Sequence, residues 1–260
     1  MLLPKHEDFK IFFWHADDGG SSFYRMKMPD LGLKVLAYNN TYGHVNLFYS
    51  CAHSATIVGQ RISEDTPSEH WQKMEYVKKK VYDIDDDLFN LDKQFHEGHA
   101  FYSRSDIQAN IIKNAQVSDV VTAASPALAE IMSKYNSNVQ YIPNGLPAEV
   151  LTWDVPKYKE DKILLGWAGT PSSKLELPLI AEPVKRLLEK SDKFEMHCVG
   201  LIPDEVIVAG LGVKGVMATS WVSGTLPYLK MINFDIWLAP YRDTPFNNAK
   251  FPTKALEAAF

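Results

Sequence analysis

Residues 164–174 run from an apolar strand into a glycine loop and then toward a helical segment, Leu164-Leu165-Gly166-Trp167-Ala168-Gly169-Thr170-Pro171-Ser172-Ser173-Lys174. Ser173 and Glu176 have the spacing of a capping box, which predicts that Lys174 lies in the first turn of a helix. The backbone N–H groups and the positive dipole end of such a turn suit a diphosphate. Gly169 lets the backbone approach a ligand closely, and Lys174 adds a charge. A plain strand–turn–helix junction without a ligand has the same local pattern.

A second glycine loop, residues 15–25, follows the first apolar strand of the chain. Gly19 and Gly20 stand where a cleft at the carboxyl ends of parallel strands would lie. Arg25 follows about one helical turn later, from where it could reach an anionic group. The alternative is a flexible turn with no ligand.

An acidic cluster, Asp83-Ile84-Asp85-Asp86-Asp87, ends another predicted strand. Carboxylates this close repel one another, so one of them can hold its proton near neutral pH and act as an acid or a base. We expect Asp85 or Asp86 to act on an acceptor. Asp83 and Asp85 also have the spacing of a carboxylate pair that binds a divalent metal ion. The third interpretation is a solvated acidic turn before the next helix.

The remaining charged candidates lie near the C-terminus. An apolar strand is followed by Pro240-Tyr241, a polar loop leads to Lys250, and a helix opens with Lys254 and Glu257. Because Lys254 and Glu257 are three positions apart, they share a helical face and could be only a surface ion pair.

Two other groups of reactive side chains favour a structural explanation. His96-Glu97-Gly98-His99 lacks the spacing of a zinc-protease helix, which predicts a surface loop. Cys51-Ala52-His53 places a thiol near an imidazole, but a small buried thiol is the commoner case. No metal ligand is expected unless Asp83 and Asp85 bind one.

Short apolar runs alternate with segments of helical periodicity, which predicts an α/β fold with parallel sheets. Strands are expected at residues 10–14, 33–37, 56–59, 80–82, 119–122, 139–142, 163–167, 194–198, 215–218 and 234–239. Helices are expected at residues 66–76, 105–116, 126–135, 174–190, 224–231 and from 252 onward.

The alternation stops at a proline-punctuated polar stretch, which is typical of a boundary between domains. We expect two Rossmann-like domains, residues 1–146 and 163–260, joined by a linker at 147–162. Fewer strands are expected after residue 162 than the roughly six of a complete doubly wound sheet. The second domain is therefore expected to be incomplete at its C-terminal end.

Composition restricts the class of protein. The 260 residues are 46% apolar and 23% charged, which is ordinary for a globular protein. The net charge of −5 argues against a protein that holds nucleic acid mainly by bulk electrostatics. The two cysteines suggest no disulfide framework. The first residues lack the long apolar run of a signal peptide, and no apolar run is long enough for a membrane span, so neither is expected. We expect a cytoplasmic protein.

Taken in order, these segments resemble the GT-B glycosyltransferases of the family 4 type, the retaining "glycosyl transferases group 1". The resemblance is strongest to bacterial and phage members with a Tyr-Asp-Ile-Asp-Asp-Asp run, here residues 82–87. Residues 120–145 are similar to the family's strand, Ser-Pro-x-Leu-Ala helix and Ile-Pro-Asn-Gly turn, and residues 166–170 to its donor-phosphate loop. Residues 215–241 are similar to the segment before the donor site. The resemblance covers nearly the whole chain and is strong from about residue 79 onward.

The resemblance implies that a nucleotide-sugar, with UDP or GDP, binds between the two domains. Glu257 corresponds to the family's glutamate on the ribose hydroxyls, and Lys250 and Lys254 to lysines that neutralise the diphosphate. The Gly19-Gly20 loop would close over the phosphates. Ala249 departs from the family pattern, in which an earlier glutamate stands there, and the usual arginine of the donor loop is absent, which leaves Lys174 as its substitute.

The function expected from the sequence is transfer of a hexose-like sugar with retention of configuration. No metal or other cofactor is obligatory in this scheme, because helix ends and lysines neutralise the phosphates. The acceptor remains open: a glycan, a lipid, a protein or modified DNA. Two alternatives are a catalytically inactive transferase-like module for binding or assembly, and a metal-dependent transferase that uses Asp83 and Asp85.

Overall fold

The computed structural model describes residues 10–44, 56–75, 77–93, 95–153 and 161–259. Its internal contacts divide the chain into two compact units. The first consists of Met1–Leu146 with Thr244–Phe251, and the second of Pro147–Asp243 with Pro252–Phe260. Residues 244–251, which the sequence prediction placed in the second domain, thus belong by their contacts to the first unit.

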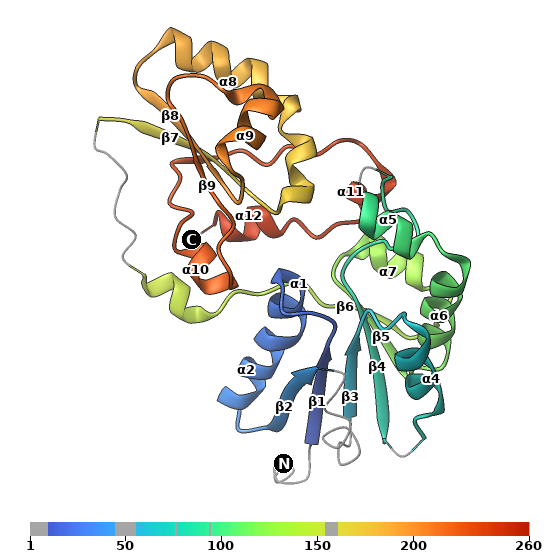
Figure 1. The fold of residues 1–260 in the computed structure, drawn as a ribbon. Helices are drawn as coiled ribbons and strands as arrows, with labels where there is room; N and C mark the ends of the chain where they lie inside the picture. Colours follow the sequence, from blue (N-terminus) through green and yellow to red (C-terminus); the bar gives the residue numbers. More distant parts are fainter. Residues whose placement is uncertain (1–9, 45–55, 76, 94, 154–160, 260) are drawn as a thin grey trace. The chain divides into compact units, whose positions relative to one another are not determined.

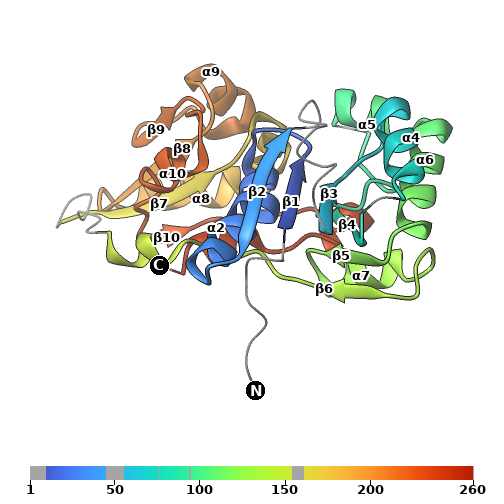
Figure 2. The same cartoon turned by 90° about the horizontal axis from the view of Figure 1, so that it is seen from below.

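The first unit contains a six-stranded parallel sheet with the order β2-β1-β3-β4-β5-β6, which can be followed in Figures 1 and 2. Its strands are β1 (Lys10–His15), β2 (Asn39–His44), β3 (Thr56–Gln60), β4 (Lys79–Ile84), β5 (Val120–Ala123) and β6 (Val139–Tyr141). From β1 the chain moves outward to β2 on one side, whereas β3 to β6 continue on the other. The boundary between β1 and β3 is therefore a switch point, where sheets of this kind bind ligands.

The helices of the first unit are α1 (Gly20–Ser22), η2 (Phe23–Lys27), α2 (Met28–Val35), α4 (Asp65–Lys73), α5 (His96–Tyr102), α6 (Ser105–Gln116), α7 (Pro126–Met132) and α11 (Pro245–Asn248). One face of the sheet packs against α4, α6 and α7, as the membership of the main hydrophobic core shows. Alternate strand residues such as Phe12 and Ile57 meet Trp71 of α4 there, and all three are fully buried. Ile107 and Ile111, four positions apart on α6, complete this side of the core.

Helix α7 begins as its sequence predicts. Ser125 is the N-cap and accepts a hydrogen bond from the Leu128 backbone N–H at 3.1 Å, and Pro126 occupies the first helical position. The Ser125 hydroxyl also donates to the carbonyl oxygen of Ala249 at 2.5 Å. This bond links α7 to the returning segment 244–251.

The prediction of a strand at residues 33–37 is wrong, because Leu33–Val35 belong to helix α2. A short apolar run has no period of its own, and here the run continues the helix that starts before it. The neighbouring strand is instead β2, whose sequence Asn-Asn-Thr-Tyr-Gly-His has few residues that favour strands. His96 and Glu97, predicted as loop, form the first turn of α5.

The second unit contains a four-stranded parallel sheet with the order β10-β7-β8-β9. Its strands are β7 (Ile163–Ala168), β8 (Phe194–Val199), β9 (Val216–Thr219) and β10 (Ile236–Trp237). Its helices are η3 (Ala148–Thr152), η4 (Pro171–Glu176), α8 (Pro178–Lys190), α9 (Pro203–Val206), η5 (Ile207–Leu211), α10 (Thr225–Leu229) and α12 (Thr253–Glu257). Trp167, Met196 and Cys198 are fully buried in its core. Burial raises the pKa of the Cys198 thiol to about 12, so this cysteine is a packing residue.

The helix predicted at residues 174–190 begins later, at Pro178. Lys174 lies in the preceding 3-10 helix η4, not in the first turn of an α-helix. The Glu176 carboxylate is occupied elsewhere: its Oε2 accepts hydrogen bonds from the Arg242 backbone N–H at 2.9 Å and from Arg242 Nε at 3.0 Å. The expected capping box between Ser173 and Glu176 is therefore corrected to an ion pair with Arg242. Among the described residues, no helix has the length and apolarity needed to cross a membrane.

Candidate functional site

Two glycine loops meet at the carboxyl ends of β7 and β8. Gly169 follows β7, and its N–H donates to the carbonyl oxygen of Val199 at 3.0 Å. Gly200 follows β8 with φ +100°, a conformation that favours glycine. A Cβ on Gly200 would lie 1.9 Å from the Gly169 carbonyl oxygen. The close approach of the two loops therefore requires glycine at position 200.

Lys254 of α12 lies beside the Gly169 loop. Its Nζ is 3.1 Å from the position of a Cβ built on Gly169. The same ammonium lies 4.7 Å from the Trp167 ring centroid and 5.7 Å from that of Tyr241, distances typical of cation–π contacts. The Trp167 indole N–H has no hydrogen-bond partner within the described part of the chain. The structure therefore brings three predicted donor-site residues together: Gly169, Tyr241 and Lys254.

Glu257 lies one turn after Lys254 on α12 and is buried. Its Oε2 accepts a hydrogen bond from the Tyr228 hydroxyl at 3.3 Å. Burial and, next, the Glu257 carboxylate raise the pKa of Tyr228, so this tyrosine stays protonated and donates the hydrogen bond to Glu257. The carboxylate is thereby held on the same helix that places Lys254 at the glycine loop.

Trp221, which the sequence analysis did not single out, lies close to these residues. It follows β9, contacts Tyr228 with ring centroids 5.8 Å apart, and 46% of its surface is exposed. Its Cε3 is 3.5 Å from the position of a Cβ on Gly200. An exposed tryptophan after a strand of a parallel sheet is a signal that sequence reading could have used.

Two further residues of the donor loop, Thr170 and Lys174, were also predicted to bind the donor. Thr170 is exposed, and its hydroxyl lies 3.4 Å from that of Ser173. Lys174 lies in η4, and the structure describes its backbone position only. These two residues remain candidates on the basis of the sequence.

Arg25 and Asp83 form a buried ion pair in the first unit. Arg25 Nε donates to Asp83 Oδ2 at 3.1 Å and Nη2 to Oδ1 at 2.6 Å, and the two residues are 4% and 2% exposed. Arg25 Nη1 donates to Asn144 Oδ1 at 3.2 Å, and Thr122 donates to Asp83 Oδ1 at 2.6 Å. Arg25, which was predicted to reach a ligand, is thus paired with Asp83 of β4. Asp83, which was predicted as one half of a metal-binding pair, is in turn occupied by Arg25.

The loop after β1 holds Gly19 and Gly20. The Gly19 N–H donates to Asp17 Oδ1 at 2.7 Å, and Gly20 is the first residue of α1. Asp17 also forms an ion pair with Arg61. The glycine loop is therefore tied to residues of its own unit, and its predicted closure over phosphates stays a prediction.

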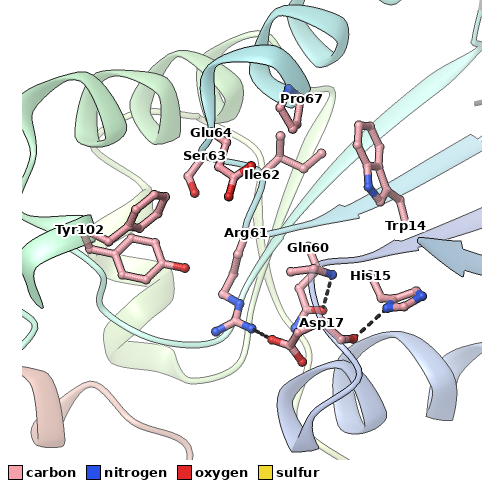
Figure 3. A pocket seen from close by; sticks show the side chains of 12 residues that line it. Trp14, His15, Asp17, Gln60, Arg61, Ile62, Ser63, Glu64, Pro67 and Tyr102 are labelled. Atoms are coloured by element: carbon pink, nitrogen blue, oxygen red, sulfur yellow. Dashed lines mark hydrogen bonds and ion pairs between the residues drawn. The ribbon is translucent and has the colours of Figure 1, made fainter. Parts of the chain in front are cut away.

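Arg61 lies at the centre of a pocket at the switch point between β1 and β3 (Figure 3). It follows β3 with φ +47°, in the left-handed region, and its N–H donates to the Asp83 carbonyl oxygen at 2.9 Å. Its guanidinium pairs with Asp17, and its Nε lies 3.4 Å from Asp85 Oδ1. Burial opposes the charge, but Asp85 and the other acidic neighbours raise the pKa of Arg61 and keep it a cation. Arg61 is not predictable from the sequence, because neither its backbone conformation nor its partners have a local signature.

The acidic cluster separates into residues with different surroundings. Asp87 is buried and accepts hydrogen bonds from the Phe89 N–H at 3.2 Å and the Asn90 side chain at 2.8 Å, so it shapes the turn. Asp85 faces Arg61. Burial and, next, Asp85 raise the pKa of Asp86, whereas Lys250 acts in the opposite direction. Of the predicted pair, Asp86 is therefore the better candidate for an acid or a base.

Lys250, predicted as a partner of Lys254, is placed with the first unit. Its Nζ lies 4.2 Å from the Phe246 ring centroid and 5.6 Å from that of Phe95. In the described ranges, no group of three or more His, Cys, Asp or Glu side chains is arranged to hold a metal ion. Cys51 and His53 fall outside the described residues.

Comparison with known proteins identifies the fold. No protein-family model matches the chain, and no curated protein matches it significantly. It is similar to the catalytic domain of starch synthase IV from Arabidopsis thaliana bound to ADP and acarbose, with 9% identity and a TM-score of 0.54 over 91% of this chain and 79% of that one. It is also similar to a protein assigned as a UDP-N-acetylglucosamine 2-epimerase from Listeria monocytogenes, with 10% identity and a TM-score of 0.51 over 83% of this chain and 70% of that one.

At these identities the similarity shows the fold. The predicted fold class, α/β with two Rossmann-like domains of the GT-B kind, is confirmed.

Proposed function

We propose that this protein is a glycosyltransferase whose second unit binds a nucleoside diphosphate sugar. One observation carries the proposal: Gly169, Tyr241 and Lys254 lie together at the carboxyl end of β7, and Glu257 follows Lys254 by one turn of α12. In parallel α/β sheets, ligands bind at this edge. The starch synthase with the same fold is bound to ADP, which supports a nucleotide ligand.

Each side chain has a role that its surroundings fit. Lys254 provides the positive charge for the diphosphate, and the missing side chain of Gly169 lets the Lys254 ammonium lie directly against the loop. Glu257, held by Tyr228, accepts hydrogen bonds from the two ribose hydroxyls. The exposed ring of Trp221 offers a surface on which the base can stack. UDP and GDP are the nucleotides to test first, as the sequence resemblance implies.

The transfer itself is proposed to proceed with retention and without an obligatory metal. The lysine and the backbone around the glycine loop stabilise the charge that develops on the leaving diphosphate. Asp83, the first residue of the alternative metal-binding pair, would have to give up a two-point ion pair with Arg25 to bind an ion. Activity that survives a strong chelator would support the metal-independent scheme, and its loss would favour the alternative.

Replacing Glu257 with alanine is expected to weaken nucleotide binding by about 1.5–3 kcal/mol, the range for hydrogen bonds to a charged group. This corresponds to a dissociation constant about 10- to 150-fold higher. Isothermal titration calorimetry with UDP and GDP measures the change. Glu189→Ala, on an exposed position of α8, is the matched control and should bind like the wild type. Unchanged affinity in Glu257→Ala would remove this residue from the site.

The raised pKa of Asp86 predicts the pH dependence of the reaction if this carboxylate accepts the acceptor proton. A base works only when ionised, so kcat/KM should fall about tenfold per pH unit below the pKa of Asp86. Because burial raises that pKa, the fall should begin at a higher pH than for an ordinary aspartate. The pH profile of Asp86→Asn should lack this acidic limb. A limb that persists in Asp86→Asn, or a loss of activity only toward high pH, would contradict the role of a base.

Ala249 favours the second candidate, a transferase-like binding module. It occupies the position of the family's earlier glutamate, is buried, and its carbonyl oxygen accepts from Ser125. No acidic side chain is therefore presented from this position. Slow release of nucleoside diphosphate from a donor sugar, measured without added acceptor, separates an active enzyme from such a module.

A further inference from the structure

The pocket at the β1–β3 switch point is a separate cavity of the first unit, with a volume of about 220 Å³. Its walls combine charged and polar side chains from the loops after β1 and β3 with aromatic rings (Figure 3). Trp14 and Gln60 come from the two strands, Arg61 follows β3, and Phe101 and Tyr102 come from α5. Figure 3 shows the Tyr102 hydroxyl directed toward the space beside Arg61.

One buried polar atom of the pocket lining, Gln60 Nε2, has no hydrogen-bond partner among the residues that the structure describes. Arg61 Nε and Asp85 Oδ1 form no hydrogen bond there either, but they pair with each other as ions at 3.4 Å. Gln60 is only 1% exposed, and its Oε1 accepts from the Ser22 hydroxyl at 2.6 Å and from the Ala16 N–H at 3.3 Å. These two bonds hold the amide so that its NH₂ group is left over. An unsatisfied buried polar group destabilises the fold, and a ligand that accepts a hydrogen bond from it would offset this cost.

The backbone conformation of Arg61 also indicates a binding site at this pocket. A non-glycine residue with φ +47° is uncommon, and such conformations cluster at binding and catalytic sites. The conformation is held by the hydrogen bond from the Arg61 N–H to Asp83. It turns the chain at the end of β3 so that the guanidinium lies between Asp17 and Asp85.

The charges decide which ligand fits. Arg61 is the cation of the pocket lining, and it is already paired with Asp17 and close to Asp85. Glu64 adds a further carboxylate to the lining. A phosphate or a carboxylate would therefore meet a surplus of negative charge. A neutral ligand with many hydroxyl groups can donate to Glu64, accept from Gln60 and Arg61, and lay its C–H face on the aromatic rings.

We propose that this pocket binds a neutral sugar ring, and that the acceptor of the transfer is a glycan whose bound residue carries no phosphate. The identification of the bound sugar as an acceptor rests on the proposed function, whereas its binding to the first unit does not.

Saturation-transfer NMR with the whole protein tests the inference. The probes are the methyl glycosides of glucose, galactose and mannose and, as charged counterparts, the hexose 6-phosphates. We expect at least one neutral glycoside to bind, with at least tenfold higher affinity than its phosphorylated counterpart. Equal or tighter binding of the phosphates, or no binding of any glycoside, would overturn the proposal.

Two variants locate the binding. Arg61→Gly removes the guanidinium at a position whose φ suits glycine, so the backbone turn should persist while glycoside affinity falls at least tenfold. Tyr102→Ala removes one aromatic wall and should have a similar effect. Lys73→Ala, at an exposed lysine of the same unit, is the control and should bind normally. Unchanged affinity in both pocket variants would place the sugar elsewhere.

Nucleotide binding, measured by calorimetry on the same samples, keeps the two proposals apart. If UDP or GDP binds and no glycoside does, the inference about the pocket fails and the proposed function stands. If glycosides bind and no nucleotide does, the proposed function fails and the sugar pocket stands.

Discussion

Replacing Asp83 with alanine should lower the free energy of unfolding by about 3–5 kcal/mol, because it leaves the Arg25 guanidinium buried without its counter-charge. Arg25 is 4% exposed and donates two hydrogen bonds to Asp83, at 2.6 and 3.1 Å. The carbonyl oxygen of Ile142 and the Asn144 side chain also accept from Arg25, but neither carries a negative charge. Thr122 would lose its acceptor as well.

Urea denaturation followed by circular dichroism measures this loss. Asp106→Ala is the control, since Asp106 pairs with Arg104 at the surface, where solvent screens an ion pair and leaves it little effect on stability. The double variant Arg25→Met, Asp83→Leu removes both charges and should recover much of the stability. A midpoint for Asp83→Ala equal to that of Asp106→Ala would mean that the buried pair contributes no more than a surface pair.

Replacing Gly200 with alanine should destabilise the second unit by about 2–5 kcal/mol. The left-handed backbone costs a non-glycine residue about 1–2 kcal/mol, and an overpacked site adds about 1–3 kcal/mol. Gly200 has φ +100°, and its new Cβ would lie 1.9 Å from a backbone atom, the Gly169 carbonyl oxygen. The Gly169 loop would have to move, so nucleotide binding should weaken together with stability.

Gly215→Ala separates the two contributions. Gly215 also has a positive φ, +88°, but the nearest atoms to a Cβ there are 3.9 Å away. It should therefore lose only the backbone contribution, about 1–2 kcal/mol, and should bind nucleotide like the wild type. Thermal unfolding and calorimetry of both variants give the comparison. Equal losses in the two variants would show that the contact with Gly169 is not important for stability.

Much of the fold could be predicted from local patterns. Helix α6 has the predicted limits Ser105–Gln116, because isoleucines four positions apart mark its buried face. Strand β7 differs from its prediction by one residue, because a buried parallel strand is a continuous apolar run. Residues 33–37 could not be predicted in this way, since four apolar residues interrupted by Lys34 fit a strand and a helix end equally well.

The candidate site was predictable only where its residues belong to a recognisable segment. Gly169, Lys254 and Glu257 follow strand and helix patterns that place them at one edge of a sheet. Arg25 and Asp83 are 58 positions apart, and their pairing depends on the packing of η2 against the sheet. Arg61 was missed because its left-handed backbone is set by tertiary contacts at the end of β3.

The return of residues 244–251 to the first unit has a practical consequence for experiments on fragments. The chain passes between the units at three points, after residues 146, 243 and 251. A protease cut in the predicted linker would therefore not separate the units cleanly, because the C-terminal fragment would still carry residues 244–251 of the first unit. A fragment that stops at residue 146 would lack α11 and the carbonyl oxygen that accepts from Ser125, so it should be less stable than the same unit in the intact chain.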